Sequence, residues 1–233
     1  SARGTLDFLV RVERINGGPA RALPLDLARV RAAIRAFKEG WRRLDPVQKA
    51  ARIKELAELG GPAAARELAR RLGDRSAMVN LELAAALGRL REKEAVPALC
   101  AWLGRVAEDT AQLTATCRAL GDIGDPRAIA PLAKGVLSGD RRTREWQLQA
   151  KERVDALAAI RDRKAVAELI SLLGKCGGGG GRRMRIRGGG GGAGYGRFHK
   201  AIQAGLTRLT GREFGTYAEW RKWWKSEGGR LEF

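Results

Sequence analysis

The hydrophobic positions of this chain recur in four similar segments, each with the spacing of two amphipathic helices joined by a short turn. The segments begin at Leu56, Leu87, Leu120 and Leu157, so successive lead leucines are 31, 33 and 37 residues apart. Self-similarity with a period of about 20–50 residues is typical of repeat architectures. Because one helical hairpin cannot bury its own apolar face, we expect the copies to stack side by side around a continuous core.

Turn residues and helical spacing place four pairs of helices in these repeats. Asp45-Pro46 and Asp125-Pro126 each combine an N-cap residue with proline at the first helical position. Gly60-Gly61-Pro62 occupies the equivalent turn of the first copy. The fold class that we expect is all-α, a right-handed α-solenoid of helical hairpins. The predicted pairs cover 46–59 with 62–73, 76–91 with 94–106, 110–123 with 126–138, and 144–161 with 164–175.

The two flanks of the repeats have different patterns. We divide the chain into an extended, strand-like segment at 1–22, the repeats at 23–175, a Gly/Arg-rich insertion at 176–197 and a final helical hairpin at 198–233. Alternating apolar residues near the N-terminus predict a short strand, which we expect to add to the sheet edge of a protein partner. The residues of this partner strand are Leu6, Phe8, Val10 and Val12.

The insertion is the most distinctive segment of the chain. Residues 177–196 contain 12 glycines, a density that disfavours a helix, so we expect a flexible loop that acts as a basic arm. Its arginines and aromatic residues predict an anion-binding arm for phosphate or carboxylate, with stacking available. The candidate binding residues are Arg182, Arg183, Arg185, Arg187, Tyr195, Arg197, Phe198 and Lys200.

The last hairpin ends in a tryptophan-rich helix. Thr216 and Glu219 have the spacing of a capping box at its start. Trp220, Trp223 and Trp224 follow at helical spacing on one face. We expect this helix to cover the open end of the repeat stack.

Charge narrows the class of partner. The chain carries 45 Lys and Arg against 26 Asp and Glu, a formal net charge of +19 at pH 7, with a sequence pI of about 11.0. The excess is denser at the C-terminal end, where 175–233 contain 13 basic and 4 acidic residues. Such a surface attracts anions. We therefore expect an acidic macromolecule as partner, with an acidic protein favoured and nucleic acid as the alternative.

Candidate catalytic groups are few, and we expect a non-catalytic protein without cofactor or metal. The sequence has one histidine, His199, and no Cys/His cluster with zinc spacing. Cys100, Cys117 and Cys176 are an odd number, and the first two lie on apolar helical faces that predict buried thiols. No apolar run is long enough to span a bilayer. The chain starts at Ser1, so export after processing stays an alternative to the slightly favoured cytoplasm.

The repeats resemble HEAT-like repeats of the type named after phycobilisome lyases. The resemblance covers roughly 46–175, and the tail at 209–224 is similar to the terminal segment of uncharacterised bacterial HEAT-repeat proteins. The residues that carry the repeat resemblance are Leu120-Gly121-Asp122-Ile123-Gly124-Asp125-Pro126-Arg127-Ala128-Ile129-Ala130-Pro131-Leu132 and Ala95-Val96-Pro97-Ala98-Leu99.

This resemblance implies a binding surface more strongly than a reaction. HEAT-like surfaces mostly bind proteins, which favours a scaffold or adaptor that holds a protein assembly through its concave face, the arm and the N-terminal strand. Two kinds of enzyme share the fold and stay as weaker alternatives, bilin lyases and alkylpurine DNA glycosylases. For a glycosylase, the candidate groove residues are Trp102, Trp146 and Asp155. Ordinary packing between hairpins is the competing explanation for the two tryptophans.

Overall fold

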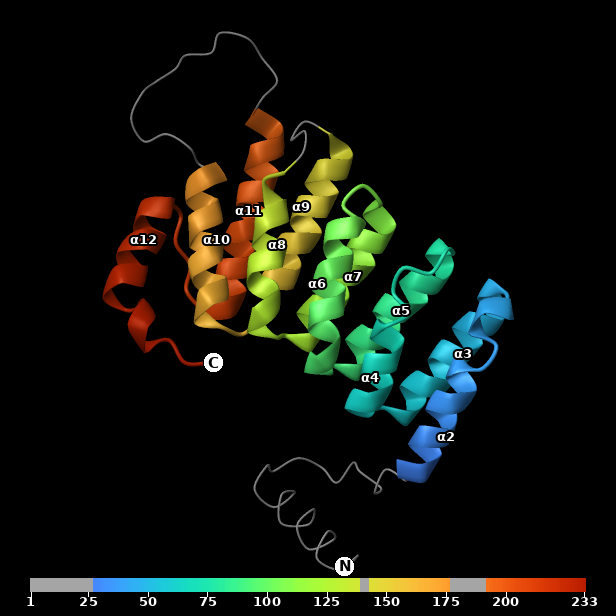
Figure 1. Ribbon diagram of the computed structural model, residues 1–233. Coiled ribbons are helices and arrows are strands. Elements are labelled where there is room, and N and C mark those ends of the chain that lie inside the picture. Colours follow the sequence, from blue (N-terminus) through green and yellow to red (C-terminus); the bar gives the residue numbers. More distant parts are fainter. Residues whose placement is uncertain (1–26, 139–142, 177–191) are drawn as a thin grey trace, which may run out of the picture.

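The computed structural model describes residues 27–138, 143–176 and 192–233 (Figure 1). Within these ranges the chain forms eleven α-helices and no strand, which confirms the all-α class there. The predicted N-terminal strand lies outside the described residues. The helices are α2 (Leu27–Lys38), α3 (Pro46–Leu59), α4 (Gly61–Ala69), α5 (Ala77–Leu90), α6 (Val96–Arg105), α7 (Thr110–Ile123), α8 (Ile129–Val136), α9 (Arg144–Leu157), α10 (Arg163–Cys176), α11 (Gly192–Thr210) and α12 (Tyr217–Ser226).

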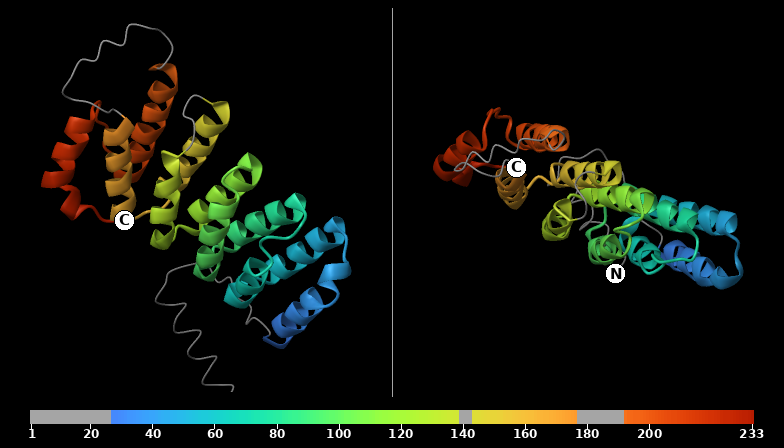
Figure 2. Two further views of the ribbon diagram at one scale, coloured as in Figure 1. Left: turned by 45° about the horizontal axis from the view of Figure 1, so that its top comes forward. Right: turned by 90° about the horizontal axis from the view of Figure 1, so that it is seen from above.

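The helices stack as successive hairpins in two layers, which are seen as two rows from above (Figure 2). The A layer consists of α3, α5, α7, α9 and α11, and each of these helices packs against the next. The B layer consists of α2, α4, α6, α8, α10 and α12. The hairpins therefore bury their apolar faces against neighbouring copies, as the repeat period predicts.

The four predicted helix pairs are confirmed, with small shifts at their ends. Short 3₁₀ turns at Lys93–Ala95 and Pro126–Ala128 precede α6 and α8. A fifth pair, α11 and α12, continues the stack. Helix α11 begins at Gly192, six residues before the start that the glycine content predicts. Because the rest of this helix packs against α9 and α10, tertiary contacts outweigh the poor helix propensity of its glycine-rich first turns.

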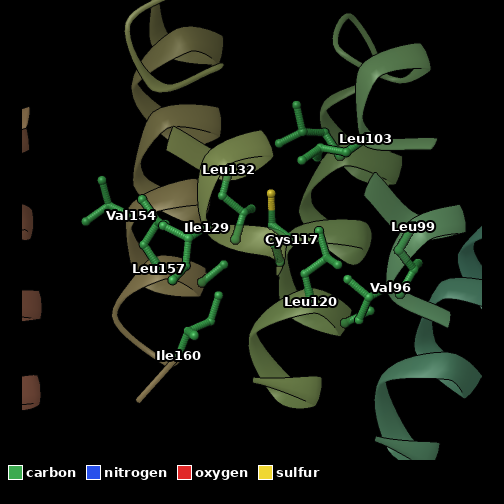
Figure 3. Packing of buried hydrophobic residues seen from close by; sticks show 14 of the residues in the cluster. Val96, Leu99, Leu103, Cys117, Leu120, Ile129, Leu132, Val154, Leu157 and Ile160 are labelled. Atoms are coloured by element: carbon green, nitrogen blue, oxygen red, sulfur yellow. The ribbon is translucent and has the colours of Figure 1, made fainter. Parts of the chain in front are cut away.

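A continuous apolar core lies between the two layers. The lead leucines Leu56, Leu87, Leu120 and Leu157 are at most 1% exposed, which explains why leucine recurs at this position. In the middle of the stack, side chains of α6, α7, α8 and α9 converge around Leu120 (Figure 3). Each hairpin thus contributes to a core that it shares with the next hairpin.

Glycine allows neighbouring A-layer helices to approach closely. A Cβ atom added at Gly88 of α5 would lie 3.0 Å from the Cα of Ala119 on α7. A Cβ atom added at Gly121 of α7 would lie 3.2 Å from the Cα of Ala156 on α9. Both glycines directly follow a lead leucine, so the same close contact recurs one repeat later. A side chain at either position would have to separate two helix backbones.

The predicted N-caps are confirmed. Asp45 accepts a hydrogen bond from the backbone N–H of Gln48, and the side chain of Gln48 accepts one from the backbone N–H of Asp45. Thr216 and Glu219 form the same reciprocal capping box at the start of α12. Each box pairs two N–H groups that a helix start would otherwise leave without a partner.

Thr216→Ala is expected to lower the free energy of unfolding by about 1 kcal/mol, the usual cost of losing an N-cap. Hydrogen bonds from the hydroxyl and the backbone N–H of Thr216 to Glu219 also hold the pKa of Glu219 below its usual range. Urea denaturation at pH 7 measures the change. Thr216→Ser retains the hydroxyl and is the matched control, and an alanine variant as stable as the serine variant would contradict the role of this cap.

An aromatic cluster closes the C-terminal end of the stack, as predicted. Trp220 is completely buried, and its ring lies edge-on to Phe214 with centroids 4.8 Å apart. Trp223 is 7% exposed, and helix α12 packs on α10. The last helix therefore covers apolar surface that would otherwise face water.

Candidate anion-binding surface

The helices of the two layers differ in charge. In the B layer, α2, α6 and α8 contain basic residues and no acidic residue, α4 contains one of each, and α10 and α12 each contain three basic residues and one acidic residue. In the A layer, α5, α7 and α9 contain equal numbers of basic and acidic residues. Basic residues outnumber acidic ones on the other two A-layer helices: α3 contains three basic and two acidic residues, and α11 contains three basic residues and no acidic residue. The net charge of the described helices is therefore more positive in the B layer than in the A layer.

The buried carboxylates of the described residues are paired within the protein. Glu67 forms ion pairs with Lys38, Arg70 and Arg71. Asp125 accepts hydrogen bonds from the side chain of Arg127, and these bonds hold its pKa below the usual range. Glu67 and Asp125 therefore pair with basic side chains of the protein itself. External anions would meet the exposed cations that lie outside these pairs.

Exposed cations gather at both ends of the B layer. At the N-terminal end, Arg31 and Arg35 lie on α2, and Arg42 and Arg43 lie on the 3₁₀ turn Trp41–Arg43. All four are exposed and form no ion pair with the described residues. At the C-terminal end, α12 carries three more exposed cations, Arg221, Lys222 and Lys225.

A cavity of about 800 Å³ opens between α6 and α8, in the middle of the B layer. Most of its lining is apolar and comes from these two helices. Two side chains of the A-layer helix α9 also line it, Gln149 and Arg153. Three exposed polar residues complete the wall: Glu108, Lys134 and Ser138.

Arg153 is the buried cation of the described residues, with 6% of its surface exposed. Each buried carboxylate of that part, on Glu67, Asp125 and Glu152, has a basic partner, whereas Arg153 has no ion pair. Its Nη1 donates two long hydrogen bonds, of 3.4 Å to the carbonyl oxygen of Pro131 and 3.5 Å to that of Leu132. Burial lowers the pKa of Arg153, because the charged form loses hydration there.

The predicted anion-binding arm is only partly visible. Arg182, Arg183, Arg185 and Arg187 lie outside the described residues. Tyr195 and Arg197 belong to the first turns of α11, and their side chains lie outside the described part as well.

Two members of the arm, Phe198 and Lys200, have described side chains. Phe198 is 4% exposed and packs on Trp146 with ring centroids 5.3 Å apart, so it lies mostly within the interface of α9 and α11 and contributes little surface for stacking. Its helical spacing with Ile202 and Leu206 is the signal of this burial. Lys200 is exposed beside a cavity of about 530 Å³ between α9 and α11, on the A layer.

The residues considered for a DNA glycosylase groove lie on two helices, Trp102 on α6 and Trp146 and Asp155 on α9. Trp146 is buried against Phe198, Trp102 is half-buried, and Asp155 pairs with Lys151 at 2.6 Å. Packing is therefore the explanation for Trp146 that the structure supports.

Reactive groups of the described part are dispersed. Cys117 is buried, and burial raises its pKa to about 12, so the thiol stays protonated. Cys100 is half-buried, and both cysteines are free. His199 is half-buried on α11. No group of three or more His, Cys, Asp or Glu in these residues has the arrangement of a metal site. None of the described helices is long and apolar enough to cross a membrane.

Two features of the surface were not singled out from sequence. The basic run from Arg29 to Arg43, with one carboxylate at Glu39, is visible in the composition and predicts a cationic end. Arg153 has no such signal, because it lies among the alternating charges of α9. Its burial beside α8 follows only from the packing of two hairpins.

The stacked hairpins are HEAT-like repeats, and residues 71–152 match the HEAT repeats family. The resemblance inferred from sequence is thereby confirmed at the level of HEAT repeats, while the phycobilisome-lyase type stays a prediction. The chain is also similar to a particular protein, a deoxyhypusine hydroxylase from Gallus gallus, at 38% identity over 79 residues. These residues are 34% of this chain and 26% of the relative, so the chain spans about a quarter of that protein's length.

Proposed function

We propose that this protein is a non-catalytic scaffold that holds an acidic partner, in the first instance an acidic protein assembly, against its B layer. The observation that carries this proposal is the larger net positive charge of the B-layer helices: α2, α6 and α8 contain no acidic residue, whereas in the A layer α5, α7 and α9 are balanced and only α3 and α11 have a basic surplus. In this proposal the stack is a right-handed α-solenoid, and the B layer lines its concave face.

A protein partner is favoured over nucleic acid by the arrangement of the surface. A duplex is bound best by one continuous basic stripe. The exposed cations on α2 and α12 lie at opposite ends of the B layer (Figure 1), with a largely apolar cavity between them. An apolar cavity accepts a side chain of a protein more readily than a sugar–phosphate backbone. The Gly/Arg arm and the N-terminal strand are further contacts in this proposal.

The test is fluorescence anisotropy of labelled polyglutamate with the full chain, from about 50 to 300 mM NaCl. We expect binding at 100 mM salt that weakens steadily as the salt concentration rises, because exposed charges are screened. A neutral peptide of equal length is the control. Absence of polyglutamate binding at 50 mM salt would contradict an acid-binding scaffold.

Nucleic acid is the second candidate, and the adjacent arginines of α2 and the following turn favour it. The same assay with duplex DNA tests it. If about six phosphates are neutralised, the logarithm of the affinity should fall with the logarithm of salt concentration at a slope near −5. Tighter binding of DNA than of polyglutamate would replace the first proposal. That binding should then be lost on glutamine substitution of Arg31, Arg35, Arg42 and Arg43.

A further inference from the structure

We propose that the cavity between α6 and α8 is a binding site for one carboxylate side chain of the protein partner, with the guanidinium of Arg153 as its ligand. The inference deepens the proposed function, because it names the chemical group by which the B layer would anchor an acidic protein. The proposal depends on that function only for the origin of the carboxylate, which would come from the acidic protein partner. The site itself rests on burial, shape and lining.

Arg153 is buried without the partner that a buried cation requires. Ionised side chains are rarely buried unless an opposite charge or several good hydrogen bonds compensate for lost hydration. The two bonds from Nη1 are at the long limit for hydrogen bonds, and no bond from Nε or Nη2 to a described residue is formed. Five side-chain polar atoms of the described residues are fully buried without a hydrogen-bond partner, and Nε and Nη2 of Arg153 are not among them. Both nitrogens therefore keep some exposed surface. Donors of the guanidinium therefore remain for a ligand in the cavity.

The fold makes room for this guanidinium at one position of α8. A Cβ atom added at Gly135 would lie 2.2 Å from Cζ of Arg153 and 2.4 Å from its Nη1. The guanidinium thus occupies the space that the side chain of any residue type other than glycine would fill at position 135. Gly135 lies within α8, where glycine has poor helix propensity, so the helix carries a residue that suits Arg153 better than it suits the helix.

The lining fits a carboxylate on an aliphatic stem. Leu103, Ala107 and Pro131 offer apolar contact for methylene groups, and the planar fork of Arg153 matches the two oxygens of a carboxylate. Lys134 adds a second positive charge at the opening, and Glu108 adds a negative one. Two cations and one carboxylate give the lining a formal charge of +1, which suits a monoanion better than a phosphate dianion.

The experiment follows the Nε–Hε signal of Arg153 by NMR in the full chain, during titration with glutamate blocked at both ends as N-acetyl and N-methylamide. We expect a saturable shift with a Kd on the order of 1–10 mM, as for a ligand of this size with one anchoring group. The matched ligand is the equally blocked glutamine, which should produce no such shift. The internal control is Arg118, whose Nε already donates to Glu152 at 3.2 Å and should not respond.

Two variants test the assignment independently. Arg153→Gln removes the cation, and Gly135→Ala places a methyl group against the guanidinium and displaces it while the charge is retained. We expect polyglutamate to bind at least about tenfold more weakly to either variant, which corresponds to about 1.4 kcal/mol. If Arg153→Gln does not fold, the alanine variant and the NMR titration still decide the matter.

The outcomes separate the site from the proposed function. A response of Arg153 to blocked glutamine, or no saturable response to blocked glutamate, would overturn the carboxylate site, and so would saturation by inorganic phosphate alone. Wild-type polyglutamate affinity in both variants would also overturn it while leaving the scaffold intact. A saturable response of Arg153 without any polyglutamate binding would support the site and contradict the scaffold.

Discussion

Trp220→Ala is expected to lower the free energy of unfolding by about 3–5 kcal/mol, the usual range for truncating a fully buried tryptophan. The indole ring is completely buried in the cluster that α12 forms over α10, against Phe214 and Trp223, with centroids 4.8 Å and 5.8 Å away. Alanine leaves a cavity at the end of the stack that terminal residues fill poorly. Because α12 caps the repeats, its release also exposes the apolar face of α10.

Urea denaturation followed by far-UV circular dichroism measures this change. Trp220→Phe is the matched control, because phenylalanine retains an aromatic ring and removes no hydrogen bond: the indole N–H of Trp220 has no partner among the described residues. We expect the phenylalanine variant to lose less than half as much stability as the alanine variant. An alanine variant within about 1 kcal/mol of the wild type would show that α12 is not a structural cap.

Gly121→Leu is the second substitution with a large expected effect, a loss of about 3 kcal/mol, at the upper end for overpacking of a core. The nearest atoms to a new Cβ are Cα of Ala156 at 3.2 Å and Cβ of Ala159 at 3.3 Å. Since one of these is backbone, relief requires α7 and α9 to move apart in the middle of the stack. Each repeat contacts mainly its neighbours, so a disturbed central interface weakens the link between the two halves.

Gly104→Leu is the matched control for helix propensity. Gly104 lies on α6, is exposed, and has no atom within 4 Å of an added Cβ. Its replacement should leave stability unchanged or raise it by up to about 1 kcal/mol, because leucine is the better helix former. Thermal unfolding of both variants decides the issue, and equal melting temperatures would contradict the close packing at Gly121.

The repeat hairpins were predictable because their signals are local. Lead leucines recur wherever a helix meets the core, and Asp45 with Pro46 marks a helix start by the chemistry of its own backbone. The start of α11 was not predictable from glycine content. The helix as a whole packs against α9 and α10, and contacts between helices of different hairpins have no local sequence signal.

The candidate site was less predictable than the fold. The excess of positive charge follows from composition, but its concentration on the B layer requires knowledge of which helices share a layer. Arg153 lies in α9 between Glu152 and Val154, and no local pattern distinguishes it from a solvated arginine. Its burial depends on the space left by the missing side chain of Gly135, which lies 18 residues earlier, in the preceding hairpin. Phe198 has the helical spacing of a core residue and packs on Trp146, so its position beside arginines in the sequence does not by itself indicate a binding role.

Binding of the acidic partner to the B layer is tested most directly by two triple variants in which the same number of charges is removed from opposite layers. Binding of labelled polyglutamate at about 100 mM NaCl is measured for each. All six side chains are exposed and form no ion pair within the described residues. The B-layer variant replaces Arg35, Lys134 and Arg221 with glutamine, and the A-layer variant replaces Lys54, Arg89 and Arg144.

Because net charge falls equally, screening and general attraction change equally in the two variants. If the partner binds the B layer, we expect at least about tenfold weaker binding for the B-layer variant, a difference of about 1.4 kcal/mol, and less than about threefold weaker binding for the A-layer variant. Equal losses in both variants would mean that the partner responds only to total charge. A larger loss in the A-layer variant would place the binding surface on the other side of the stack and contradict binding to the B layer.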